Sequence, residues 1–209
     1  MTEKSLQNKV IGMILGLAIA ETLLEQFPQH GDNFAGTQKL EAISPSYTQQ
    51  LLSNPDATFQ SILNTHYGLR PLLNLCFQGV PPSQWLLRLL DDVELATGME
   101  QALHRIGHVV GWGSQTRAIK HIRASGVEDT MLPIALYFLM HNIESPISGI
   151  TAAVELEPTS WPIPVVVGMA TGALYGVEIF PSAWLHNIPD LPKLTQIATA
   201  HGDKWLGSL

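Results

Sequence analysis

The 209-residue sequence has few charged side chains and lacks the signatures of several common protein classes. Asp, Glu, Lys and Arg make up 14% of the residues, against about 25% in an average soluble domain. Cys76 is the only cysteine, which excludes a disulfide-stapled fold. The 11 Lys and Arg are outnumbered by 18 Asp and Glu, so no nucleic-acid partner is expected. Hydrophobic residues reach 45%, which excludes intrinsic disorder.

Two uncharged runs raise the alternatives of export and membrane association. Residues 10–20 follow two lysines and end in Ala-Ile-Ala, like a signal-peptide cleavage site, but this run is too short to span a bilayer. Residues 158–177 have spanning length, but three prolines in their first third predict an uninterrupted helix only from Val165. We therefore expect a cytoplasmic protein and keep a membrane-associated subunit as an alternative.

Helical periodicity recurs along the chain, whereas sustained alternation and Asn-Gly or Asp-Gly hairpin turns are absent from the sequence. The predicted helices cover residues 5–26, 46–53, 55–66, 69–77, 84–96, 99–110, 116–124, 129–141, 145–157, 165–179 and 192–200. No repeat, low-complexity tract or linker interrupts this series. The sequence thus predicts a single all-α domain over residues 1–209.

Two of these helices carry small residues at every fourth position, on one helical face. They are Gly12, Gly16 and Ala20 in the first, and Gly168, Gly172 and Gly176 in a later one. Glycine costs a helix about 0.5–1 kcal/mol relative to alanine, so close approach of another backbone is the expected compensation. We expect both helices to lie centrally, against each other.

Several polar groups have the residue types of chemical sites. Glu100, His104 and His108 are spaced i, i+4, i+8, which suits a zinc site or an exposed Glu–His pair. Four further groups are interpreted as an acidic surface (Asp91, Asp92, Glu94), a loop (Gly111, Trp112, Gly113, Ser114) and two turns (His30, Gly31, Asp32; His201, Gly202, Asp203).

Three stretches resemble the ADP-ribosylglycohydrolase family. Residues 12–23, Gly-Met-Ile-Leu-Gly-Leu-Ala-Ile-Ala-Glu-Thr-Leu, resemble its opening helix. Residues 131–137, Met-Leu-Pro-Ile-Ala-Leu-Tyr, resemble a later helix. Residues 167–176 followed by Phe-Pro-Ser-Ala-Trp-Leu at 180–185 resemble its last core helix. The resemblance implies a compact orthogonal helical bundle and hydrolysis of ADP-ribose bonds with two magnesium ions held by carboxylates.

The chain departs from that family where the metal ligands belong. The family motif Gly-Gly-Asp-Thr-Asp-Thr falls on residues 157–162, Glu-Pro-Thr-Ser-Trp-Pro, which contain no aspartate. The family's earlier Asp-Asp-Thr motif has no counterpart soon after the first helix, and Asp91-Asp92-Val93 lies too far along. Magnesium needs oxygen ligands in near-octahedral geometry, generally with carboxylates. The remaining pocket candidates are Glu21, Glu157, Thr159, Ser160 and Trp161.

The leading hypothesis is a degenerate family member without catalysis, without cofactor, that acts by binding a protein partner or as a scaffold. In it, Trp161 and the neighbouring prolines fill the former metal pocket. The alternative is a divergent hydrolase of an ADP-ribosyl or related glycosidic bond. That enzyme would hold Mg²⁺ through carboxylates drawn from Glu21, Asp91, Asp92 and Glu157.

Overall fold

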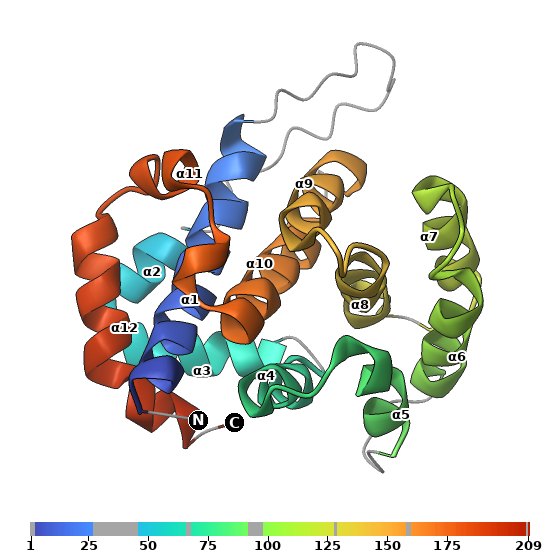
Figure 1. Ribbon diagram of the computed structural model, residues 1–209, viewed down its shortest axis with the longest axis horizontal. Helices are drawn as coiled ribbons and strands as arrows, with labels where there is room; N and C mark the ends of the chain where they lie inside the picture. Colours follow the sequence, from blue (N-terminus) through green and yellow to red (C-terminus); the bar gives the residue numbers. More distant parts are fainter. Residues whose placement is uncertain are drawn as a thin grey trace.

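The computed structural model describes residues 3–26, 46–65, 68–91, 98–127, 129–157, 160–207 and 209. Over these ranges the chain forms α-helices, two short 3₁₀ helices and no strand (Figure 1). The elements are α1 (Glu3–Gln26), α2 (Tyr47–Ser53), α3 (Pro55–Thr65), α4 (Leu69–Gln78), η1 (Pro82–Gln84), α5 (Trp85–Leu90), α6 (Met99–Val109), α7 (Gln115–Arg123), α8 (Met131–His141), α9 (Pro146–Leu156), α10 (Pro162–Tyr175), η2 (Val177–Ile179), α11 (Ser182–His186) and α12 (Leu191–Leu206). The all-α prediction is confirmed.

Helices α1 and α10 form the centre of the molecule and run antiparallel through their glycines. A Cβ atom added at Gly12 would lie 2.6 Å from the carbonyl oxygen of Gly172. One added at Gly16 would collide with the backbone of Gly168 and lie 3.0 Å from the Phe180 ring. Real Cβ atoms do not approach backbone this closely, so the two helices require glycine at these positions. The predicted contact between them is confirmed.

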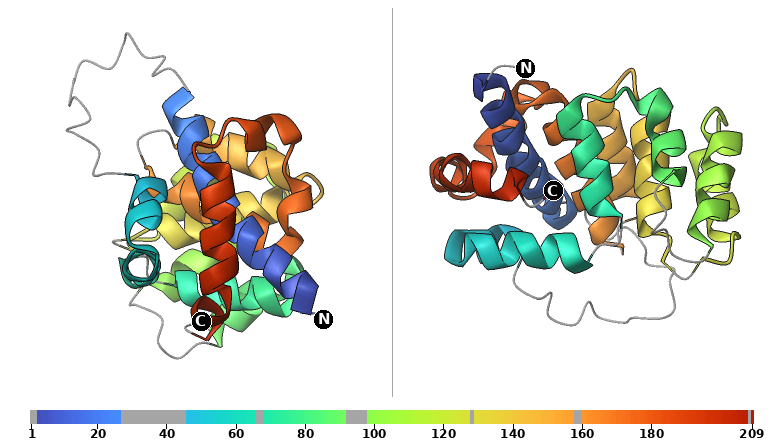
Figure 2. Two further views of the ribbon diagram at one scale, coloured as in Figure 1. Left: turned by 90° about the vertical axis from the view of Figure 1, so that its left-hand side faces the viewer. Right: turned by 90° about the horizontal axis from the view of Figure 1, so that it is seen from below.

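The other helices surround this central pair (Figures 1 and 2). Helices α2, α3 and α12 contact one another on one side, and α12 and α2 also touch α1. Helices α4, α8 and α9 pack against α10 on the other side. The pair α6 and α7 lies outside α8 at the edge of the molecule. A continuous cluster of buried apolar side chains joins these layers.

Three of the predicted boundaries that differ from the structure have a clear physical reason. Helix α10 begins at Pro162, not at Val165, because prolines in a first helical turn lose no intrahelical hydrogen bond. It ends at Tyr175 because Gly176 has φ of 83°. Helix α12 continues to Leu206, beyond the predicted residue 200, because Trp205 is buried, 1% exposed.

Among the described residues, one helix is long and apolar enough to cross a membrane by length and composition, Ser5–Gln26. In the fold, 61% of its most apolar window is buried inside the protein. Its glycine face meets α10, so the apolar composition of α1 serves a packed helical interior. The second uncharged run, residues 158–177, contains helix α10, which has 14 residues.

Candidate functional site

Glu21 lies near the end of α1 with its side chain only 4% exposed. Its carboxylate accepts two backbone N–H groups at the start of α2: Oε1 from Tyr47 at 2.8 Å and Oε2 from Thr48 at 3.0 Å. The first N–H groups of a helix have no partner within the helix, and the helix dipole favours negative charge there. The N-cap hydroxyl of Ser46 accepts a third N–H, from Gln49. Glu21 therefore completes the capping of α2 from a distant part of the chain.

Trp161 reaches the same place through Tyr47. The two rings lie 4.5 Å apart between centroids, at 49°. Trp161 directly precedes α10, and the antiparallel packing brings that end of α10 level with the last turns of α1. A Cβ added at Gly168, for example, would lie 3.2 Å from the Cβ of Ala20. The structure thus brings two of the five predicted residues, Glu21 and Trp161, together across Tyr47.

Glu157 follows the last residue of α9 and is also 4% exposed. Its Oε2 accepts a hydrogen bond from Nη2 of Arg123 at 2.5 Å, and that guanidinium, in the last turn of α7, is half exposed. Ser160 is adjacent through its backbone, because its N–H donates to the carbonyl oxygen of Glu157 at 3.0 Å. Thr159 lies outside the described residues. The Glu157 carboxylate is therefore paired with a side chain of α7.

Burial raises the pKa of both carboxyl groups. At Glu21 desolvation is the largest cause, and it is opposed by the hydrogen bonds from Thr48 and Tyr47. At Glu157 desolvation again comes first, opposed by the charge and hydrogen bond of Arg123. Protein donors, rather than solvent, offset the burial of each carboxylate.

The suspected zinc residues form an exposed pair. His104 Nε2 lies 3.7 Å from Glu100 Oε1, with the two side chains 59% and 76% exposed. His108 is exposed as well. Within the part of the chain that the structure describes, no group of three or more His, Cys, Asp or Glu is placed to share a metal ion. Of the two interpretations of this spacing, the Glu–His pair is the one present.

The remaining polar groups divide between confirmed and corrected interpretations. Residues 111–114 form the predicted loop between α6 and α7, and Asp91 is exposed at the end of α5. Asp92, Glu94 and residues 30–32 lie outside the described ranges. The turn predicted at residues 201–203 is wrong, because these residues lie inside α12. There Gly202 lets the helix approach α1, since an added Cβ would lie 3.2 Å from a Val10 methyl group.

Sequence reasoning missed a carboxylate that joins α3 to α12. Asp56 Oδ1 accepts from Trp205 Nε1 at 3.0 Å and contacts His201 Nδ1 at 2.8 Å, while Oδ2 accepts from Lys204 Nζ at 2.5 Å. The Lys204 hydrogen bond is the main reason that the pKa of Asp56 falls to about 2. Trp205 also stacks on Phe59, with centroids 4.7 Å apart. If α12 is taken to extend past residue 200, residues 201, 204 and 205 share one helical face. This shared face is the signal in the sequence that could have indicated a common partner.

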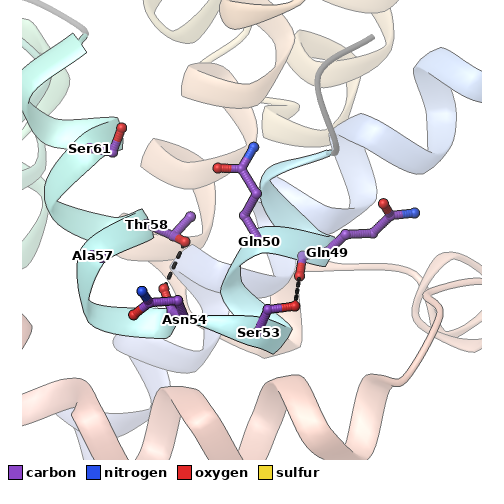
Figure 3. A pocket seen from close by; sticks show the side chains of 7 residues that line it. All are labelled: Gln49, Gln50, Ser53, Asn54, Ala57, Thr58 and Ser61. Carbon is purple, nitrogen blue, oxygen red and sulfur yellow. Dashed lines mark hydrogen bonds between the residues drawn. The ribbon is translucent and has the colours of Figure 1, made fainter. Parts of the chain in front are cut away.

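A surface hollow of about 500 Å³ lies between α2 and α3 (Figure 3). Amide and hydroxyl side chains line it, and none of them is charged: Gln49, Gln50, Ser53, Asn54, Ala57, Thr58 and Ser61. Two of its hydroxyls are bonded to backbone within these helices, Ser53 to Gln49 O at 3.0 Å and Thr58 to Asn54 O at 2.7 Å. No predicted candidate belongs to this lining.

The family model described as ADP-ribosylglycohydrolase matches residues 41–206, most of the chain. The chain belongs to the ADP-ribosylglycohydrolase family. No curated protein and no solved structure matches it. Glu157, Ser160 and Trp161 fall inside the segment that matches the ADP-ribosylglycohydrolase model, whereas Glu21 precedes it. The predicted membership is confirmed.

Proposed function

We propose that this protein is an ADP-ribosylglycohydrolase-like protein that has lost di-magnesium catalysis and acts in the cytoplasm by binding a protein partner. The observation that carries the proposal is the engagement of Glu21. Both of its carboxylate oxygens accept backbone N–H groups of α2. A metal ion at Glu21 would have to compete with these donors and would leave N–H groups of α2 unpaired.

The second buried carboxylate supports the same proposal. Arg123 places a fixed positive charge against Glu157, where a divalent cation would be repelled. Magnesium prefers oxygen ligands in near-octahedral geometry, and besides Glu157 the described part of residues 157–162 offers the neutral hydroxyl of Ser160. The described residues therefore do not fit a pair of magnesium ions. The ring contact between Tyr47 and Trp161 fills space beside Glu21.

A divergent hydrolase of an ADP-ribosyl or related N- or O-glycosidic bond is the second candidate, and the family match is what favours it. It requires carboxylates that converge on metal ions. Glu21 and Glu157 are both bonded to protein groups, and Asp91 is exposed at the end of α5. This candidate therefore needs Asp92 or other residues outside the described ranges.

The deciding experiment incubates the purified full chain with ADP-ribosyl-arginine and millimolar magnesium chloride, and measures released ADP-ribose by chromatography. We expect no release above a protein-free blank, and no magnesium binding by calorimetry. Magnesium-dependent release would overturn the proposal and favour the hydrolase. The control is a mock preparation from cells that do not express the chain, carried through the same purification; release of ADP-ribose by it identifies a contaminating enzyme.

A further inference from the structure

The α6–α7 hairpin, residues 99–124, is a basic part of an acidic chain. It holds four of the eleven Lys and Arg residues and one of the eighteen Asp and Glu residues. Its net charge is therefore +3, and the remaining residues together carry −10. It also contains three of the eight histidines. The proposed loss of catalysis does not explain this segregation of charge.

Among the residues that the structure describes, three of the four cations have no carboxylate partner, and two of these are exposed. Arg105 donates to the carbonyl oxygen of His121 at 2.8 Å, and Arg123 pairs with Glu157. Arg117 and Lys120 are exposed and form no ion pair with any residue that the structure describes. They lie three residues apart on α7, so their side chains are neighbours on one face. This face offers two positive charges to a partner.

An exposed tryptophan lies beside that face. Trp112 is 40% exposed, and its ring centroid lies 5.4 Å from that of His121 on α7. Cβ atoms added at the flanking Gly111 and Gly113 would meet nothing within 4 Å, so the loop is open to solvent. Trp and Arg are the residues most enriched among those that dominate protein–protein binding.

The position of the hairpin leaves this surface accessible. Helices α6 and α7 lie at the edge of the molecule and contact α8 and α5 on their inner side (Figures 1 and 2). Their buried positions are all apolar, among them Ala102, Leu103, Ile106, Ala118, Ile119 and Ile122. The charged side chains therefore occupy the face turned away from the core.

We propose that the α6–α7 hairpin docks an acidic segment of a partner protein. Arg117 and Lys120 pair with carboxylates of that segment, and Trp112 covers an apolar side chain next to them. A protein segment fits better than a nucleic acid, because two unpaired cations neutralise few phosphates and the acidic remainder of the chain repels a long polyanion. The proposal rests on the protein-binding part of the proposed function and is independent of whether the chain has catalytic activity.

Fluorescence anisotropy of a fluorescein-labelled peptide of alternating glutamate and leucine tests the proposal with the full chain. We expect binding that weakens with added salt, because screening shortens electrostatic range to about 3 Å at 1 M. Arg117→Glu and Lys120→Glu should each weaken binding about fivefold, since each removes an attraction and adds a repulsion. Trp112→Ala should weaken it about tenfold.

The matched control is Lys193→Glu, the same charge reversal at another exposed lysine, on α12 at the opposite edge of the molecule (Figure 1). It should change binding less than about twofold, because it lies beyond the screening length of about 8–10 Å. An equal effect of Lys193→Glu and Lys120→Glu would overturn the proposal, as would no binding, or tighter binding of a single-stranded RNA or anionic vesicles. Hydrolase activity in the same sample would instead overturn the loss of catalysis.

Discussion

Replacing Glu21 by alanine should destabilise the protein by about 2–3 kcal/mol. The substitution leaves the N–H groups of Tyr47 and Thr48 without their acceptor. A hydrogen bond to a charged group contributes about 1.5–3 kcal/mol, so two such bonds contribute about 3–6 kcal/mol. Removing the buried charge also removes its desolvation cost, which raises the pKa of Glu21, and this offsets part of the lost hydrogen-bond energy. Glu21→Gln keeps one acceptor oxygen and should lose about half as much.

Urea unfolding followed by tryptophan fluorescence measures this loss. With an m value of about 2 kcal/mol/M, Glu21→Ala should lower the urea midpoint by about 1 M. The control is Glu25→Ala, one turn further along α1 at an exposed position, which should change stability by less than about 0.5 kcal/mol. Equal midpoints for Glu21→Ala and wild type would refute the capping role.

The pH dependence follows from the direction of the Glu21 pKa shift. Its folded pKa lies above the ordinary value of 4.5, so its protonation favours the folded state. The stabilisation is fully present below the unfolded pKa and is lost as pH rises through the folded pKa. Glutamine does not titrate, so the wild type should exceed Glu21→Gln by more at pH 4 than at pH 7.5.

Three other substitutions test the rest of the structure. Gly16→Ala should lower the free energy of unfolding by about 3 kcal/mol, because the added Cβ collides with the α10 backbone. Gly107→Ala, on the exposed side of α6, should raise it by up to about 1 kcal/mol, because its Cβ meets nothing closer than 3.8 Å; urea midpoints compare the two variants. Arg123→Ala leaves Glu157 buried without its cation and should cost about 2 kcal/mol at neutral pH and less at pH 4, where Glu157 is protonated; a pH-independent loss in urea unfolding would contradict this. Asp56→Asn should lower the melting temperature at pH 7, and this difference should vanish as pH falls from the ordinary pKa of 3.8 through the folded pKa of about 2; a constant difference in thermal scans would exclude the ion-pair explanation.

The contact between α1 and α10 was predictable because glycine repetition at every fourth position has few explanations inside a helix. Gly12 and Gly16 face the partner glycines directly, as the spacing implied. The end of α12 was not predictable in the same way. Gly202, between two polar residues, is typical of a turn, and only the approach to Val10 explains it as part of a helix.

The candidate site was only partly predictable. Sequence comparison singled out Glu21 and Trp161, and the structure places both beside Tyr47. The donors that engage Glu21 and Glu157 could not be found from the sequence, because capping by a residue 26 positions away and pairing with Arg123 depend on tertiary packing. Local patterns specify which groups need partners, whereas the fold decides which partners they receive.

The glycine contact also sets an order of events during synthesis. Gly16 can meet Gly168 only after about 150 further residues have left the ribosome, which takes about 8–30 s at typical rates of about 5–20 residues per second. Throughout that interval α1, the longest helix that the structure describes, has no partner for its glycine face. Such a high contact order slows folding, and a nascent α1 is the segment that a chaperone would have most reason to cover.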